Sequence, residues 1–419
     1  MVRLDAARAP RRVFAVPTPG MLAEPAYRRL WVSGLAYYHV YMGEIVIAGW
    51  TVFSLTNSPF AVGLIGFCRM LPMLVLGLIL GTLADRFRGQ LLLLGVQIGG
   101  LLTALTLAGL FAVGSPPLWA LCLLTGLLGV GWTCDFSARR ALIAQMQSPE
   151  RLGSAMSLET VSMLGSKIGA TALGGLLLAI DGPRLAYGWL ALVYGVGIVL
   201  ALRLRGDSAA IRREPPAAVS LLALVRTGWT AAVRTPLVRA VLLVTVVMNL
   251  LVFSYQQIIA VIAGQILQVD AVRMGILAGI DGVGAIVVAA ILVTRKGPLR
   301  RGGIFLVGAC GAAALVAVLG LSRSYPLSLV AQVLLGAGAG AFGSMQATII
   351  AGAVAPEVRA RAMGILAMAI GVTPFGILLS GALSAAIGPG ITLATLGLLA
   401  LALNLAILAR NRELVKGVG

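Results

Sequence analysis

Long apolar runs separated by short polar segments dominate the sequence. A helix that crosses a bilayer needs about 20 mostly apolar residues, and twelve runs of that kind are present. The segments between them carry charges, prolines and glycines, which are typical of turns at a membrane face. The pattern therefore predicts an all-α polytopic membrane protein with 12 transmembrane helices. The predicted spans are 31–54, 60–81, 91–113, 118–136, 155–180, 185–204, 238–262, 273–293, 304–322, 327–350, 362–384 and 388–408.

Composition agrees with this class. Hydrophobic residues make up 59% of the 419 residues and charged residues only 11%, with a mean hydropathy of +1.01. A soluble domain of this length could not bury that much apolar surface. We therefore expect a membrane protein and not a soluble enzyme.

The net charge of +18 would suit a nucleic-acid partner, but the distribution of the charges argues against one. If the N-terminus is inside, all but five of the 32 Lys and Arg residues fall in cytoplasmic segments. This asymmetry follows the positive-inside rule and predicts that both termini are cytoplasmic. We expect the basic loops to orient the chain in a bacterial inner (plasma) membrane and to contact anionic lipids.

The chain consists of two similar halves. Its longest polar interruption separates residues 1–204, an N-terminal six-helix bundle, from residues 238–419, a C-terminal six-helix bundle. Residues 205–237 are predicted to be a cytoplasmic linker with an interfacial helix. Small residues recur at a fixed offset between the halves: Gly129 and Gly131 correspond to Gly336 and Gly338 at an offset of 207. This repetition indicates internal duplication.

A polar motif between the second and third runs carries a family resemblance. The segment contains Gly81, Asp85, Arg86, Arg88 and Gly89. It resembles the loop signature of the major facilitator superfamily (MFS), although the last glycine comes one residue later than in the family pattern. Together with the duplication, the resemblance implies a transporter whose two halves rock about a central site.

The same resemblance implies a role for this motif. Its aspartate would brace the cytoplasmic ends of helices that separate during opening, so the motif would act as a gate. The segments Leu55–Pro59, Arg69–Pro72, Ala138–Ala141 and Pro356–Arg361 are most similar to a bacterial branch of enterobactin and drug exporters. The predicted gating residues are Gly81, Asp85, Arg86, Arg88, Gly89, Arg139 and Arg140.

Charged residues inside the spans are candidates for function, because an ionised side chain at mid-bilayer costs at least about 2.5–3.5 kcal/mol. Five qualify: Glu44, Arg69, Glu159, Lys167 and Asp281. Glu44 and Arg69 lie almost equally far from the turn near residue 57, so a rise of 1.5 Å per residue puts them at one depth. They could form a permanent ion pair or a pair that breaks when a proton or a cationic substrate arrives.

Helical spacing places Tyr37, Tyr41 and Glu44 on one stripe of the first helix. An offset of 212 maps these residues onto Asn249, Phe253 and Gln256 of the seventh helix. Because the resemblance implies that helices one, four, seven and ten line the cavity, these residues and Arg69 are the predicted substrate contacts. The alternative is that they hold helices together by interhelical hydrogen bonds.

The fifth and eighth helices supply a second predicted pair. The resemblance packs these two helices together, and Lys167 and Asp281 lie near their middles. We expect an ion pair between the halves that acts as a lock, with proton coupling through Asp281 as the alternative. Glu159 lies two turns nearer the cytoplasm, where it could meet Arg139 or Arg140.

No phosphate-binding loop or metal-ligand cluster is apparent, so we expect no enzyme activity, cofactor or metal. The leading hypothesis is a monomeric, proton-coupled exporter of small amphiphilic compounds, such as a drug, siderophore or secondary metabolite. Glu44 is the first candidate for the coupling residue. Uptake or uniport of a polar metabolite or lipid-like substrate, and a non-transporting receptor or assembly factor, are the alternatives. The sequence leaves substrate, direction and coupling stoichiometry open.

Overall fold

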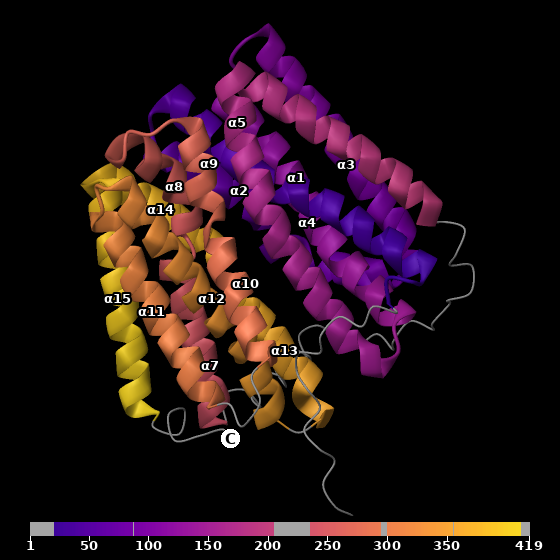
Figure 1. Cartoon of the computed structure of the whole chain (residues 1–419), viewed down its shortest axis with the longest axis vertical. Helices are drawn as coiled ribbons and strands as arrows, with labels where there is room; N and C mark the ends of the chain where they lie inside the picture. The colour runs from indigo at the N-terminus through magenta and orange to yellow at the C-terminus, as the bar shows by residue number, and fades with distance from the viewer. Residues whose placement is uncertain (1–20, 87, 205–234, 295–299, 355, 412–419) are drawn as a thin grey trace, which may run out of the picture.

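The computed structural model describes residues 21–86, 88–204, 235–294, 300–354 and 356–411, and every regular element in these ranges is helical. Figure 1 shows two bundles of long helices, coloured indigo to magenta for the first half and orange to yellow for the second. The helices of the first bundle are α1 (Pro25–Thr56), α2 (Pro59–Arg86), α3 (Gly89–Val113), α4 (Leu118–Met146) and α5 (Pro149–Leu204).

Several spans of the second bundle are broken into shorter helices. Its elements are α7 (Pro236–Val247), η1 (Met248–Val252), α8 (Tyr255–Val261), η2 (Ile262–Ile266), α9 (Ala271–Gly279), α10 (Asp281–Thr294), α11 (Arg301–Leu321), α12 (Tyr325–Ala353), α13 (Pro356–Ile370), α14 (Thr373–Ile387) and α15 (Pro389–Arg410). Both η elements are single π-helical turns. Residues 205–234 of the predicted linker lie outside the described residues.

Proline marks the start of many of these helices. The first residue of α1, α2, α5, α7, α13 and α15 is a proline. Proline fits there because its φ is already helical, and because the N–H that it lacks would have no partner within the helix. The sequence therefore encodes the helix starts locally.

The prediction of an all-α membrane protein with twelve spans is confirmed. Ten segments of the described chain are long and apolar enough to cross a membrane. One of them, Arg151–Leu204, bends into two rods because Asp181 and Gly182 leave the helical conformation. Adding α1, whose tyrosines, histidine and Glu44 lower its hydropathy, completes the twelve.

Several predicted boundaries differ from the observed helix ends, and two of them bear on the candidate site. The fourth helix continues through Met146 and not to residue 136, and the second continues through Arg86 and not to residue 81. The apolar run shows where lipid contact ends, but backbone hydrogen bonding continues through the polar residues that follow. Gly81–Arg86 are therefore the last turns of α2, and α3 already begins at Gly89.

The two bundles meet at one end and diverge toward the other (Figure 1). We call the side where α1 starts and α15 ends the terminal face, and the side of the α1–α2 connection the distal face. The principal contacts between bundles join α1, α2 and α5 to α8, α9, α14 and the start of α10. Among the described residues, α7 and α13, the terminal-face parts of their spans, have no comparable contact with the first bundle.

Glycines permit the close approach at the distal end. Gly63 of α2 faces Gly381 of α14, and Gly175 of α5 lies against the backbone of α9 near Gly275. A methyl group at any of these positions would collide with the opposing backbone. Small residues at such crossings are the usual solution where lipid offers no hydrophobic driving force.

Candidate functional site

Glu44 and Arg69 meet inside the first bundle. Nε of Arg69 lies 2.6 Å from Oε2 of Glu44, and both side chains are buried. The two charges lie at one depth, as their distances from the turn at Asn57 require. The contact is an ion pair without hydrogen-bond alignment, since both carboxylate oxygens of Glu44 lack a donor within the described part of the chain. Arg69 instead donates from Nη2 to the carbonyl oxygen of Tyr41.

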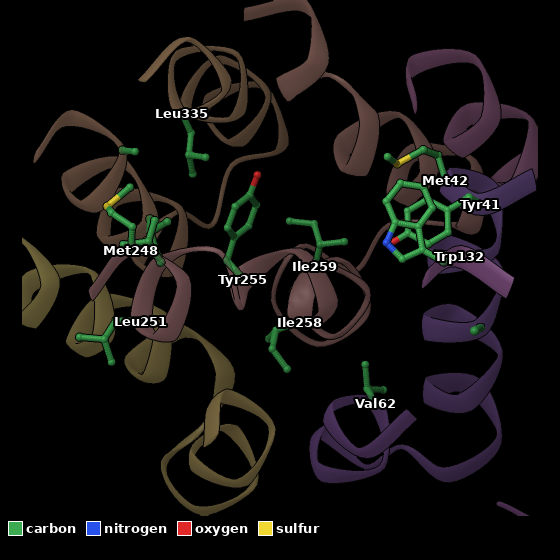
Figure 2. Close-up of a cluster of buried hydrophobic side chains, with 14 of the residues drawn as sticks. Tyr41, Met42, Val62, Trp132, Met248, Leu251, Tyr255, Ile258, Ile259 and Leu335 are labelled. Carbon is green, nitrogen blue, oxygen red and sulfur yellow. The ribbon is translucent and has the colours of Figure 1, made fainter. Parts of the chain in front are cut away.

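Aromatic rings surround this pair. Cζ of Arg69 lies 4.2 Å from the ring centroid of Tyr41, and the Tyr41 ring stacks on Trp132 at 3.7 Å with an interplanar angle of 11°. Figure 2 shows these two rings lying face to face. The ring of Tyr37 lies parallel to the Trp132 ring, with 6.4 Å between the ring centroids. The same Tyr37 ring packs edge-on against the ring of Tyr194. The cluster therefore combines two charges with flat aromatic faces, which suits amphiphilic rings.

Sequence reasoning missed Trp132 and Tyr194. Both lie in apolar runs that show no polar stripe, so only the packing of α4 and α5 against α1 reveals them. The signal that was available is the Gly129–Gly131 pair, which marks where α4 approaches a neighbour. Gly129 packs directly against the carbonyl oxygen of Arg69, so it holds the Arg69 backbone beside Trp132.

This contact leads to a prediction with a matched control. A Cβ at Gly129 would collide with the Arg69 carbonyl, whereas a Cβ at Gly131 would make ordinary contacts with Val96 and Tyr37. Gly129→Ala should therefore destabilise the protein by about 1–3 kcal/mol, and Gly131→Ala should change little. Thermal unfolding of the two purified variants in one detergent measures the difference. Equal midpoints would show that α2 and α4 can separate freely here.

The second predicted pair joins the two bundles. Nζ of Lys167 on α5 lies 2.7 Å from Oδ2 of Asp281, the first residue of α10. The hydroxyl of Tyr255 on α8 donates to the same oxygen at 3.0 Å, a partner that the sequence did not suggest. Figure 2 shows Tyr255 projecting from the helix that lies between the bundles. The carboxylate of Asp281 on α10 is thus contacted by α5 of the first bundle and by α8 of the second.

Tight packing holds Asp281 against α5. A Cβ at Gly279 would collide with Thr171, and one at Gly282 would lie against Ile168. The helix breaks at Ile280, so Asp281 begins a new helix with its carboxylate in the first turn. A carboxylate is favoured there because the helix dipole places partial positive charge at that end.

The seventh-helix residues do not form the predicted single polar face. Asn249 accepts a hydrogen bond from Thr373 of α14 at 3.0 Å, and the ring of Phe253 packs against Phe342 of α12. Gln256 is half-buried, whereas its neighbour Gln257 lies against Gly49 and Gly66 of the first bundle.

The reason is the π-helical turn η1, which spans Met248–Val252. Such a turn inserts one extra residue and rotates the following side chains by about 100° relative to a regular α-helix. The residue-by-residue mapping from the first helix therefore fails beyond Asn249. Gln257, which the sequence did not single out, is the amide that crosses between the bundles.

A third constellation centres on Arg139. Its Nε and Nη2 donate to the two oxygens of Asp135 at 2.9 and 2.6 Å, and its Nη1 donates to the carbonyl of Leu30 on α1 at 2.9 Å. Glu159 of α5 lies 3.6 Å from Nε. Arg139 is buried because α1 and α5 cover this part of α4, so it does not lie in a solvated cytoplasmic segment. The sequence analysis also missed Asp135, which lies one residue before the predicted end of the span.

The remaining gating residues are only partly described. The backbone of Gly81, Asp85 and Arg86 belongs to α2, but the side chains of Asp85 and Arg86 lie outside the described part of the chain. Arg88 is exposed, and Gly89 begins α3 against the side chain of Leu142. A larger residue at Gly89 would have to displace Leu142, so its position fits the packing of α3 on α4. Arg140 stacks its guanidinium 3.4 Å from the Phe136 ring.

The comparisons with known proteins agree with this architecture. Residues 30–371 match the model of the Major Facilitator Superfamily. A curated relative, the Staphyloferrin A transporter of Staphylococcus aureus, is 22% identical over 173 residues, which is 41% of this chain and only 43% of that relative's length.

Two solved structures show the same fold at low identity. A POT family transporter in complex with a thioalcohol conjugated peptide gives a TM-score of 0.73 at 12% identity, covering 95% of this chain and 99% of that one. The second is a bacterial homolog of the human lysosomal transporter Spinster in an inward-facing and unoccupied conformation. It gives a TM-score of 0.66 at 15% identity, and the match covers 93% of each chain.

Proposed function

The chain belongs to the Major Facilitator Superfamily, and on this basis we propose that it is a secondary transporter that exports small amphiphilic compounds in exchange for protons. The observation that carries the proposal is the Lys167–Asp281 ion pair, which joins α5 of the first bundle to the start of α10 in the second. A buried pair between two bodies that must rock is a natural lock for alternating access. We propose that residues 1–204 and 238–419 are those bodies.

The arrangement of the bundles corresponds to one state of such a cycle. They are joined at the distal face and diverge toward the terminal face, which the positive-inside rule predicts to be cytoplasmic. With this topology we propose that the arrangement is an inward-facing state, in which the bundles are joined at the outer face. Opening the distal face would separate Gly175 from α9 and pull Lys167 away from Asp281.

We propose that the substrate engages Glu44, Arg69, Tyr41 and Trp132. A planar ring can exchange for one partner of the Tyr41–Trp132 stack, and the carboxylate of Glu44 can accept from a cationic or hydroxyl group. Similarity to a Staphyloferrin A transporter and the exporter-like motifs support a siderophore or another amphiphilic metabolite. The bacterial relative also supports a plasma-membrane location.

Flux through proteoliposomes tests this function directly. With an imposed pH gradient, we expect uphill movement of an amphiphilic cation such as ethidium, or of a catecholate siderophore, opposite to the proton flow. Collapse of the gradient should stop it. Transport of every probe at rates independent of the gradient would contradict proton coupling, and movement only along the proton flow would contradict export.

A single substitution tests the proposed substrate contact. Glu44→Gln should lower transport of the cationic probe about tenfold or more, because a hydrogen bond to a charged group is worth roughly 1.5–3 kcal/mol. The matched control is Glu24→Gln, since Glu24 forms only an exposed ion pair with Arg151. Initial rates over a range of probe concentrations separate the two variants. Equal rates would remove Glu44 from the substrate site.

A further inference from the structure

The buried charges of the described chain do not balance. Seven acidic or basic side chains in the spans are at most 8% exposed, and four of them are acids while three are bases. The acids are Glu44, Asp135, Glu159 and Asp281, and the bases are Arg69, Arg139 and Lys167. An uncompensated charge in such surroundings costs several kcal/mol, so the surplus carboxyl identifies a place where a proton can be held.

Three of the acids have a cation of their own. Glu44 is paired with Arg69 and Asp281 with Lys167, and Asp135 takes two hydrogen bonds from Arg139. The third nitrogen of Arg139 is also engaged, with the carbonyl of Leu30.

Glu159 is therefore the surplus acid. Its contact with Arg139 is a longer ion pair, 3.6 Å from Nε and beyond hydrogen-bond distance, and its Oε1 accepts a hydrogen bond from the hydroxyl of Tyr38 at 2.5 Å. Gly34 of α1 lies directly against both Arg139 and Glu159, so α1 covers the carboxyl. The titratable and charged groups that face Glu159 are Tyr27 and Tyr38 on α1 and Asp135, Arg139 and Arg140 on α4.

The effect of one proton differs among these acids. A proton on Glu44 would leave Arg69 without its counter-charge, and a proton on Asp281 would leave Lys167 without one. A proton on Glu159 leaves Arg139 with both bonds to Asp135 and leaves Arg140 stacked on Phe136, so both cations keep a partner. Gain and loss of a proton at Glu159 is therefore the change that disturbs the buried charges least.

We propose that Glu159 carries the coupling proton of the transport cycle, in place of Glu44, which the sequence made the first candidate. The assignment rests on the proposed proton-coupled function. Tyr38, which bonds to Glu159, packs edge-on against Trp132, and Trp132 stacks on Tyr41 beneath Arg69. A change at Glu159 thus reaches the proposed substrate site through a continuous set of contacts.

A conformational measurement tests the proposal without a known substrate. Spin labels at Gln145 and Gly352, exposed positions near the terminal-face ends of α4 and α12, report the opening of that face. The four native cysteines are first replaced by serine. In full-length protein in lipid nanodiscs, we expect the label–label distance distribution to change with pH. Glu159→Gln should abolish that pH response, and the control Glu24→Gln, at an exposed ion pair, should retain it.

A second variant and a spectroscopic readout separate titration from structural damage. Tyr38→Phe keeps the carboxyl and should shift the midpoint of the pH response without removing it. Infrared difference spectra between acidic and alkaline pH should contain a protonated-carboxyl band that is lost in Glu159→Gln. If Glu159→Gln responds to pH as the parent protein does, the assignment is wrong while proton coupling stands. If the parent protein shows no pH response, proton coupling and the assignment both fail.

Discussion

Replacing Lys167 by methionine is expected to abolish transport and to destabilise the protein by about 3–5 kcal/mol. The substitution removes the cation that lies 2.7 Å from Asp281. Among the described residues, it leaves the buried carboxylate with the hydroxyl of Tyr255 as its side-chain donor. Stranding one partner of a buried pair typically costs this much. Thermal or denaturant unfolding of purified protein measures the loss of stability, and the proteoliposome assay measures the loss of transport.

The double variant Lys167→Met with Asp281→Asn distinguishes a lock from a simple stabilising contact. It leaves no charge unpaired, so most of the lost stability should return. Transport should not return, because the closed distal face no longer has a charge pair to break and remake. Full activity in the double variant would show that the pair is dispensable to the cycle. Tyr255→Phe, which removes one hydrogen bond, should cost only about 1 kcal/mol.

The sequence predicted both ion pairs, for different reasons. Glu44 and Arg69 flank one tight turn, so counting residues from Asn57 fixes their relative depth. Lys167 and Asp281 were paired through the family resemblance, and the structure joins them across the bundles. For the first pair the helical turns between Asn57 and each charge are regular, so spacing along the chain converts directly into position. The second pair follows a helix break at Ile280, so only the resemblance could place Asp281.

Where the helices are irregular or outlast their apolar run, the sequence misled. The π-helical turn η1 rotates the end of the seventh helix, and it is Gln257 that lies against Gly49 and Gly66 of the first bundle. The fourth helix continues past residue 136 and α1 covers that turn, so Arg139 is buried together with Asp135. Hydropathy alone cannot distinguish a charge beyond the helix end from one that a neighbouring helix covers.

Arg139→Met is expected to be the most damaging change in the first bundle. One side chain satisfies both oxygens of Asp135 and the carbonyl of Leu30, so its loss strands a fully buried carboxylate and loosens α1 from α4. We expect a loss of at least about 3–5 kcal/mol, seen as a large fall in the yield of monodisperse protein. Arg140→Met is the control, because its guanidinium is only partly buried and stacks on Phe136.

Second-site variants show which charge causes the loss. Adding Asp135→Asn to Arg139→Met removes the stranded carboxylate, so unfolding midpoints should recover in large part. Adding Glu159→Gln as well should give no further gain if Glu159 already holds a proton, since a neutral group has no charge to strand. A large additional gain in the triple variant would mean that an ionised Glu159 depends on Arg139 as its counter-charge, which would contradict the premise that its carboxyl is the surplus acid. Comparing the double with the triple variant therefore tests the charge of Glu159 through stability alone, independently of transport.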